Sequence, residues 1–218
     1  MNEFRQYRTL LEGEYILVAG DCSAGGNDRS VCQFLSQNKQ DVFMVYQTQK
    51  LATEMTSDIY PVLNKICDIT GIEPLIAYER NNGGLFEMER LAAMNRKGKY
   101  EIFKMPQVGR TATETMPVKY GWDTNTATRP AMLSQLKEAI DKKVLKIYDK
   151  QTIEEMFSFI VSQTSSSWKA QAEKNANDDL VMALAIAWQL YQMTGHRGKR
   201  NNDDYNNREE RRLNPMTV

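Results

Sequence analysis

The chain has 218 residues, enough to bury a sizeable core in one domain with a tail. Its 28 lysines and arginines balance 28 aspartates and glutamates, so no net field marks nucleic acid or a membrane surface as a partner. Cys22, Cys32 and Cys67 form no C-x-x-C pair and indicate reduced packing thiols, and the single histidine, His196, excludes most catalytic triads and histidine-rich zinc sites.

The first half of the chain predicts a sheet that begins with an apolar run over 15–21. This run is apolar on both alternating faces, as is typical of a strand that helices cover on both sides. The polar residues before it, 1–13, predict a lead-in segment that pairs or docks loosely. Short turns join the run to predicted strands over 29–35 and 41–48, so we expect three antiparallel neighbours.

The middle of the chain alternates helices with strands. Helical spacing predicts a helix over 53–70, and a buried strand over 75–79 follows it. Gly83-Gly84 then precedes a helix over 85–95, and a helix between strands is typical of a parallel crossover. The pairs Gly25-Gly26 and Gly83-Gly84 leave two interpretations open, a plain turn or backbone that approaches a phosphate.

The second half of the chain begins with a predicted short strand over 101–105 and a long irregular stretch over 107–129. Helices are predicted over 130–142 and 151–163, with an edge strand over 145–148 between them. A strongly apolar helix is predicted over 180–193. That last apolar run is too short to cross a bilayer, and no signal pattern opens the chain, so we expect a soluble protein. We therefore divide the chain into a lead-in segment over 1–13, one α/β domain over 14–194 and a disordered polar tail over 195–218.

Four carboxylates occupy special positions in this pattern. Asp21 and Glu79 close two buried strands, and Asp178 and Asp179 open the last helix. Each has an ordinary interpretation by itself, as a helix cap or a solvated strand end. Together they offer the oxygen ligands that Mg²⁺ and Mn²⁺ prefer, in a chain with one histidine.

Helical spacing separates the two aspartates of the last helix. Asp179, Met182 and Ala183 share the face that packs on the sheet, so we expect Asp179 to point inward. Asp178 points about 100° away, where it would cap or support the site.

These residues resemble a known family. The order Asp21-Cys-Ser-x-Gly, then Ile76-Ala-Tyr-Glu79 with Asn81, then Asn-Asp178-Asp179-Leu-Val-Met-Ala-Leu is similar to the nuclease domain of tailed-bacteriophage large terminases, the DNA-packaging motor proteins. The resemblance spans roughly 14–193 and implies a ribonuclease H-like mixed β-sheet, three antiparallel strands and then parallel strands, flanked by helices.

The resemblance also implies an activity. The chain would be an endonuclease that cuts double-stranded DNA with low sequence specificity by using two Mg²⁺ or Mn²⁺ ions. Asp21, Glu79 and Asp179 would be the catalytic acids and metal ligands, with Asp178 as a further ligand. The family often has histidine where this chain has Asn177, so any role of that histidine is missing or changed here.

The partners implied by the resemblance are double-stranded DNA, an N-terminal ATPase domain, a portal and a small terminase subunit, in a viral packaging complex in the host cytoplasm. This chain has no G-x-x-x-x-G-K-[ST] motif, so the ATPase would be separate and translocation would not be its own activity. The candidates for contacts with DNA are Arg80, Arg110, Lys119 and Arg129.

Alternatives stay open at this point. Trp122 lies in the long stretch with three of the basic candidates, where a hairpin would touch or gate the duplex, and it fits equally well as an anchor on the core. A Holliday-junction resolvase would also place acids at strand ends and on its last helix. A non-catalytic DNA-docking module would use the same acids as caps.

Overall fold

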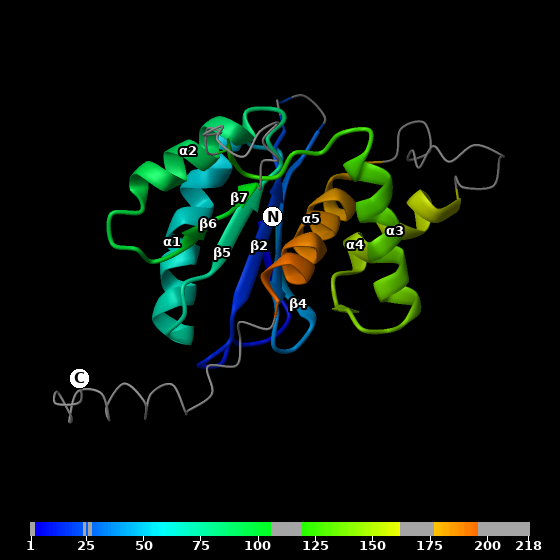
Figure 1. Ribbon diagram of the computed structural model, residues 1–218, viewed down its shortest axis with the longest axis horizontal. Coiled ribbons are helices and arrows are strands. Elements are labelled where there is room, and N and C mark those ends of the chain that lie inside the picture. Colours follow the sequence, from blue (N-terminus) through cyan, green and yellow to red (C-terminus); the bar gives the residue numbers. More distant parts are fainter. Residues whose placement is uncertain (1–2, 24, 26–27, 106–118, 162–176, 196–218) are drawn as a thin grey trace, which may run out of the picture.

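The computed structural model describes residues 3–23, 25, 28–105, 119–161 and 177–195, and its centre is a twisted sheet of seven strands (Figure 1). In spatial order the strands are β1 (Phe4–Gln6), β4 (Asp41–Thr48), β3 (Ser30–Ser36), β2 (Ile16–Asp21), β5 (Leu75–Tyr78) and β6 (Glu101–Ile102), with β9 (Lys146–Ile147) paired to β4. The strands β2, β3 and β4 are antiparallel, whereas β5 is parallel to β2, and β6 to β5. The predicted mixed sheet is therefore confirmed.

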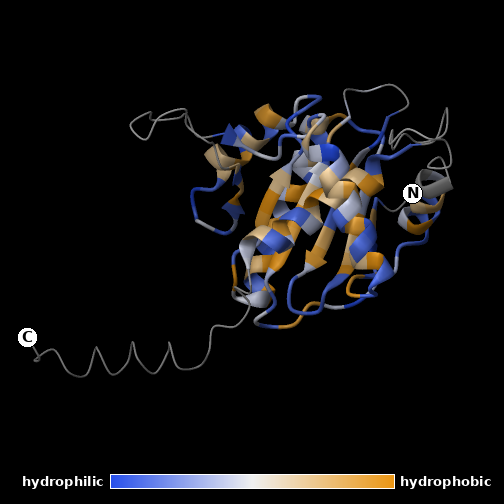
Figure 2. Ribbon diagram, turned by 45° about the vertical axis from the view of Figure 1, so that its right-hand side comes forward, coloured by the Kyte–Doolittle hydropathy of each residue, from blue (hydrophilic) through white to orange (hydrophobic). Residues whose placement is uncertain are grey.

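Helices cover both faces of the sheet. On one face lie α1 (Ala52–Thr70) and α2 (Gly84–Met94), and on the other lie α3 (Thr128–Asp141), α4 (Lys150–Val161) and α5 (Asp179–Thr194) (Figure 1). Two apolar cores result, one on each side of the strands. Figure 2 shows hydrophobic residues along the central strands and hydrophilic residues in the connecting loops. The sheet is covered on both sides because its strands are apolar on both faces.

The helix α5 lies directly on the sheet. Every residue from Leu180 to Trp188 is buried, because β2 and β3 cover one side of the helix and α3 and α4 lie against its other sides. A helix that is buried on all sides needs no amphipathic stripe. Its position is thus set by packing along almost its whole length.

The predicted strand over 101–105 divides into two elements. Its first part is β6, and its second part, β7 (Lys104–Met105), turns away to pair antiparallel with β8 (Lys119–Tyr120). Buried Phe103 separates the two parts and stacks on Trp122 with 5.8 Å between ring centroids. Most of the predicted irregular stretch, residues 106–118, lies outside the described residues.

The N-terminal segment contributes β1, which pairs antiparallel with β4 at the sheet edge. Arg5 reaches buried Asp149, with Nε and Oδ1 2.6 Å apart. Arg8 contacts two further buried acids, Glu14 and Asp41, each at 2.7 Å. The segment that was expected as a lead-in thus supplies counter-ions to the domain, while the expected tail beyond Gly195 lies outside the described residues.

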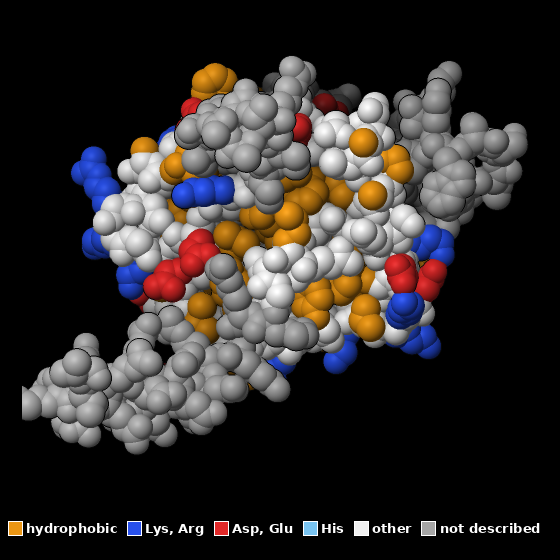
Figure 3. All heavy atoms as spheres, viewed as in Figure 1, with side chains coloured by type: hydrophobic (Ala, Val, Ile, Leu, Met, Phe, Trp, Pro, Cys, Tyr) orange, Lys and Arg blue, Asp and Glu red, His pale blue; other side chains and the backbone are white. Residues whose placement is uncertain are grey.

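On the face seen in Figure 3, the described Lys and Arg side chains lie apart near the edges, and hydrophobic side chains occupy the centre. No helix among the described residues is long and apolar enough to span a membrane.

Candidate functional site

The strands β2 and β5 bring the first two predicted acids together. Because Gly20 pairs with Tyr78 in a parallel register, the next residues, Asp21 and Glu79, emerge side by side at the same end of the sheet. The charge of Glu79 acts on Asp21, so the two carboxyl groups are close neighbours. Asp21 is only 9% exposed and Glu79 only 7%, so both lie largely out of water.

The helix α5 adds the third acid. Asp179 is its first residue, and its Oδ2 accepts a long hydrogen bond of 3.4 Å from the backbone N–H of Arg29, just before β3. The charges of Asp179 and Asp178 both act on Asp21. The structure therefore gathers carboxylates that are up to 158 positions apart in the sequence, from 21 to 179.

The electrostatics of this cluster favour protons or cations. Burial first, and then the neighbouring Glu79, Asp179 and Asp178, raise the pKa of Asp21 well above its usual range. Burial likewise raises the pKa of Asp179 to about 6, with help from Asp178 and Asp28 and against the effect of the Arg29 N–H. Buried acids that repel one another are stabilised when a proton or a cation joins them.

The donor chemistry fits a hard divalent cation, since every side-chain donor is a carboxylate oxygen, and two of the four carboxylates, Asp21 and Glu79, are buried. In the positions that the side chains occupy, no three His, Cys, Asp or Glu residues of the described ranges surround a common point suited to an ion. Cation binding would require these carboxyl groups to be deprotonated, since metal ligands carry no proton.

Asp178 has a different environment from Asp179. It is the N-cap residue of α5, but its side chain makes no cap hydrogen bond, so the interpretation of this side chain as a cap is wrong. Instead it forms an ion pair with Arg129, near the start of α3. This pair links α3 to the beginning of α5.

The other basic candidates are also placed. Arg80 follows Glu79 directly, its side chain is 17% exposed, and its Nη1 lies 3.9 Å from Asp123. Lys119 lies in β8, beside β7. Arg110 lies outside the described residues. Among the candidates with a described partner, Arg80 and Arg129 each contact an acid of the chain itself.

The end of β5 is held by the backbone around Trp122. The N–H of Trp122 donates to the carbonyl of Tyr78 at 2.8 Å, and the N–H of Arg80 donates to the carbonyl of Trp122 at 2.9 Å. The indole is buried, and its Nε1 donates to Met132 Sδ. The interpretation of Trp122 as an anchor is thus confirmed.

Gly83 forms a tight turn, and Gly84 allows the backbone of α2 to lie close to the backbone of Glu79. Gly83 has a φ of 88°, and a Cβ on Gly84 would lie 1.8 Å from the carbonyl oxygen of Glu79. The first turn of α2 therefore packs against the strand end that carries Glu79, at a distance that only glycine allows.

Glu155 is a residue of the site that the sequence did not indicate. It lies on α4, and its Oε1 accepts a hydrogen bond of 3.0 Å from the N–H of Val181 in α5. Burial raises its pKa to about 7, opposed by hydrogen bonds from Val181 and Leu180 and assisted by the charge of Asp179. Nothing in the amphipathic pattern of its own helix relates residue 155 to residue 181.

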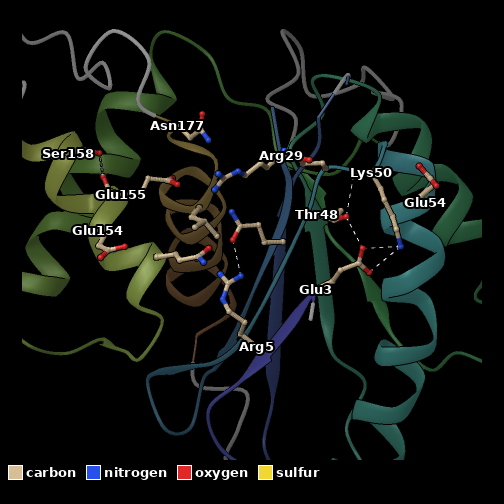
Figure 4. A pocket seen from close by; sticks show the side chains of 14 residues that line it. Glu3, Arg5, Arg29, Thr48, Lys50, Glu54, Glu154, Glu155, Ser158 and Asn177 are labelled. Atoms are coloured by element: carbon tan, nitrogen blue, oxygen red, sulfur yellow. Dashed lines mark hydrogen bonds and ion pairs between the residues drawn. The ribbon is translucent and has the colours of Figure 1, made fainter. Parts of the chain in front are cut away.

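A groove of 1210 Å³ is lined by residues of α4, of the sheet edge and of the start of α5, and none of the four predicted acids is among the residues that line it (Figure 4). Arg29 and Glu155 point toward one another in it, and Lys50 lies on its far wall. The charged lining residues are Arg5, Arg29, Lys50, Glu3, Glu54, Glu154 and Glu155. Both signs are mixed, so this groove is not a continuous basic track for a phosphate backbone.

Comparison with known proteins identifies the fold. No protein-family model and no curated protein sequence matches the chain. Among solved structures, the nuclease domain of the Thermus phage P74-26 large terminase aligns with a TM-score of 0.57 and 14% identity, covering 88% of this chain and 87% of that one. The magnesium-bound large terminase nuclease of thermophilic phage G20c aligns with a TM-score of 0.58 and 15% identity over 87% and 88%.

A viral protein from a different host class has the same arrangement. The manganese-soaked terminase nuclease domain of human cytomegalovirus aligns with a TM-score of 0.51 and 13% identity, covering 84% of this chain and 90% of that one. These identities are low, and the agreement lies in how the strands and helices are arranged. The chain therefore has the fold of the terminase nuclease domains.

Proposed function

We propose that this chain is a metal-dependent endonuclease that cuts double-stranded DNA with low sequence specificity, as the nuclease domain of a viral terminase large subunit. The observation that carries the proposal is that Asp21 and Glu79 leave β2 and β5 side by side, with Asp179 near enough for its charge to act on Asp21. The terminase nuclease folds solved with magnesium, zinc, cobalt or manganese support it.

Asp21, Glu79, Asp178 and Asp179 would hold Mg²⁺ or Mn²⁺, two ions in all. Such ions, when bound, polarise a phosphodiester and lower the pKa of water. Asp21 would be the central ligand, because it leaves the sheet beside Glu79 and the charges of both aspartates of α5 act on it. Asp21 would therefore be needed to hold either ion.

The surrounding residues orient these acids. Asn81 Nδ2 donates to Glu79 Oε1 at 3.0 Å, which fixes one carboxylate oxygen and leaves the other for a ligand. Arg129 neutralises Asp178 and would have to share it with an ion or release it to contact DNA. Arg80, Lys119 and Arg110 are the other proposed contacts with DNA.

The balanced charge of the chain predicts weak binding to DNA by this domain alone. In the proposed packaging complex, in the host cytoplasm, a separate ATPase domain, a portal and a small terminase subunit would hold it near the duplex. Tethering raises the effective concentration of a weak binder. Activity in isolation would then be slow but measurable at high protein concentration.

The test is plasmid nicking with Mg²⁺, Mn²⁺ or EDTA. Asp21→Asn should reduce cleavage by more than about 100-fold, since loss of an outer-shell partner alone costs up to that much. The control is Glu154→Gln, whose side chain is 61% exposed on α4. Circular dichroism should show both variants folded. Mn²⁺-dependent cleavage that survives in Asp21→Asn would refute the proposal.

A second substrate separates this function from junction resolution. Linear duplex and a four-way junction of the same sequence are compared at equal concentration. The proposal expects similar cleavage rates for both, and a strong preference for the junction would indicate a resolvase.

A further inference from the structure

The first turn of α5 lacks a cap from its own sequence. The first N–H groups of a helix have no partner within the helix and are usually satisfied by the side chain of the N-cap residue. Here the side chain of Asp178, the N-cap residue, pairs with Arg129 and makes no cap bond. The N–H groups of Leu180 and Val181 therefore need an acceptor from elsewhere.

Glu155 is that acceptor, and it comes from another helix. Its carboxylate accepts a hydrogen bond of 3.0 Å from the backbone N–H of Val181, and the N–H of Leu180 lies near enough to the same carboxylate to lower its pKa. A carboxylate is a favourable partner for a helix N-terminus because of the helix dipole. The cap thus ties α4 to the turn of α5 that carries Asp179.

The other contacts of this turn show why the cap matters. On the sheet side, buried Gln33 of β3 donates to the carbonyl of Leu180 at 3.2 Å and to Thr152 of α4 at 3.0 Å. Among the described residues, the hydrogen-bond donor to the Asp179 carboxylate is the N–H of Arg29, at a long 3.4 Å. Gln33 and Glu155 therefore both contact the backbone of the turn that carries Asp179, in addition to the packing that places the rest of α5.

We propose that Glu155 is a positioning residue, which caps α5 from α4 and so holds Asp179 beside Asp21 and Glu79. The catalytic half of this inference rests on the proposed nuclease function. The capping half rests only on the contacts of Glu155 and is tested without any catalysis.

The first experiment measures amide hydrogen exchange in the metal-free, full-length chain. Glu155→Ala should speed exchange at Leu180 and Val181 by at least about 10-fold, the equivalent of losing one hydrogen bond to a charged group. Glu155→Gln keeps an acceptor oxygen and should stay within about threefold of the unmodified chain. Glu154→Ala, the exposed neighbour on α4, is the matched control and should not change exchange. Unchanged exchange in Glu155→Ala would overturn the cap.

The second experiment measures kcat and KM for plasmid DNA with Mn²⁺. Glu155→Ala should lower kcat by about 10- to 100-fold and leave KM nearly unchanged, as expected for a partner that orients a ligand. Glu155→Gln should restore kcat to within about threefold. Faster exchange with normal kcat in Glu155→Ala would show a merely structural cap and overturn the positioning role.

Two further outcomes are decisive. If Glu155→Ala does not fold, the test uses Glu155→Gln. A large loss of kcat in Glu155→Gln, together with normal exchange at Val181, would refute hydrogen bonding as the means by which Glu155 positions Asp179. If the unmodified chain does not cut DNA at all, the nuclease function fails, while the exchange experiment still decides the cap.

Discussion

The surroundings of Asp179 disfavour the ionised form of its carboxyl group. Burial, Asp178 and Asp28 together raise its pKa to about 6. Between the pKa of about 4 that an unfolded aspartate has and this value, the folded state binds more protons than the unfolded state. The free energy of unfolding must therefore fall as pH rises through this window, and the stabilising contribution is complete only below about pH 4.

Asp179→Asn should remove this penalty in the metal-free protein. We expect the Tm in EDTA to rise by about 2–5 °C at pH 7.5 and to change little at pH 4, because the charge is absent there in both proteins. Thermal unfolding followed by circular dichroism from pH 4 to pH 8 measures it. Glu154→Gln, an exposed acid, should show no such pH dependence. A lower Tm for Asp179→Asn at pH 7.5 would contradict the assigned repulsion.

At the scale of elements, the end of β5 is enclosed by close backbone contacts. The first turn of α2 packs on the carbonyl of Glu79, and the segment around Trp122 extends the sheet beside it with a parallel bridge to Glu79. Gly121, at a φ of 79°, would place a Cβ 2.7 Å from the carbonyl oxygen of Tyr78. These contacts hold Glu79 against a helix on one side and a loop on the other.

Gly84→Ala tests this packing. Alanine in a helix is normally more favourable than glycine by about 1 kcal/mol, but here its Cβ would overlap the Glu79 carbonyl. We expect the free energy of unfolding to fall by about 2 kcal/mol or more, as in other overpacked sites, and cleavage to weaken. Gly83→Ala is the control, since its Cβ meets nothing within 4 Å and only its positive φ costs energy, about 1–2 kcal/mol. Urea unfolding measures the stability of both variants. Equal stability of Gly84→Ala and the unmodified chain would contradict the predicted overlap with the Glu79 carbonyl.

At the scale of the whole molecule, the N-terminal segment belongs to the fold through buried ion pairs. Asp149 is 1% exposed and lies at the start of α4, where it receives hydrogen bonds from Arg5, Tyr7 and Thr152. Burial alone would raise its pKa, but these three donors lower the pKa to about 2. A group with a lowered pKa stabilises the fold above the unfolded pKa of about 4 and loses this effect as pH falls toward 2.

Arg5→Met should therefore destabilise the domain in a pH-dependent way. Removing one partner of a buried ion pair costs about 3 kcal/mol, which we expect at pH 7 and expect to shrink as pH approaches 2, where Asp149 is protonated. Lys150→Met removes a cation that is 86% exposed and should change stability by less than about 0.5 kcal/mol. Urea unfolding at pH 7 and pH 3 measures both. A loss in Arg5→Met that is the same at both pH values would show that packing, not charge, holds the segment.

The local sequence pattern was sufficient to predict most strands of the sheet and the positions of Asp21 and Glu79 at strand ends. The apolar run over 15–21 and the run over 41–48 identify β2 and β4 because a strand covered on both faces is apolar throughout. Short turns predict antiparallel neighbours, and an intervening helix predicts a parallel one, as β3 and β5 show. A polar residue at the end of such a strand must lie at the edge of the core, so Asp21 and Glu79 were recognisable one at a time.

Only the tertiary structure decided what these residues meet. Contacts between α4 and α5, such as Glu155 with Val181, join surfaces whose pairing leaves no periodic trace in either segment. The same holds for the pairing of Arg129 with Asp178 and for the choice of β4 as the partner of β9, the edge strand predicted over 145–148. Hydrophobic periodicity records which face of an element is buried, and the partner across that face is chosen by the packing of the whole chain.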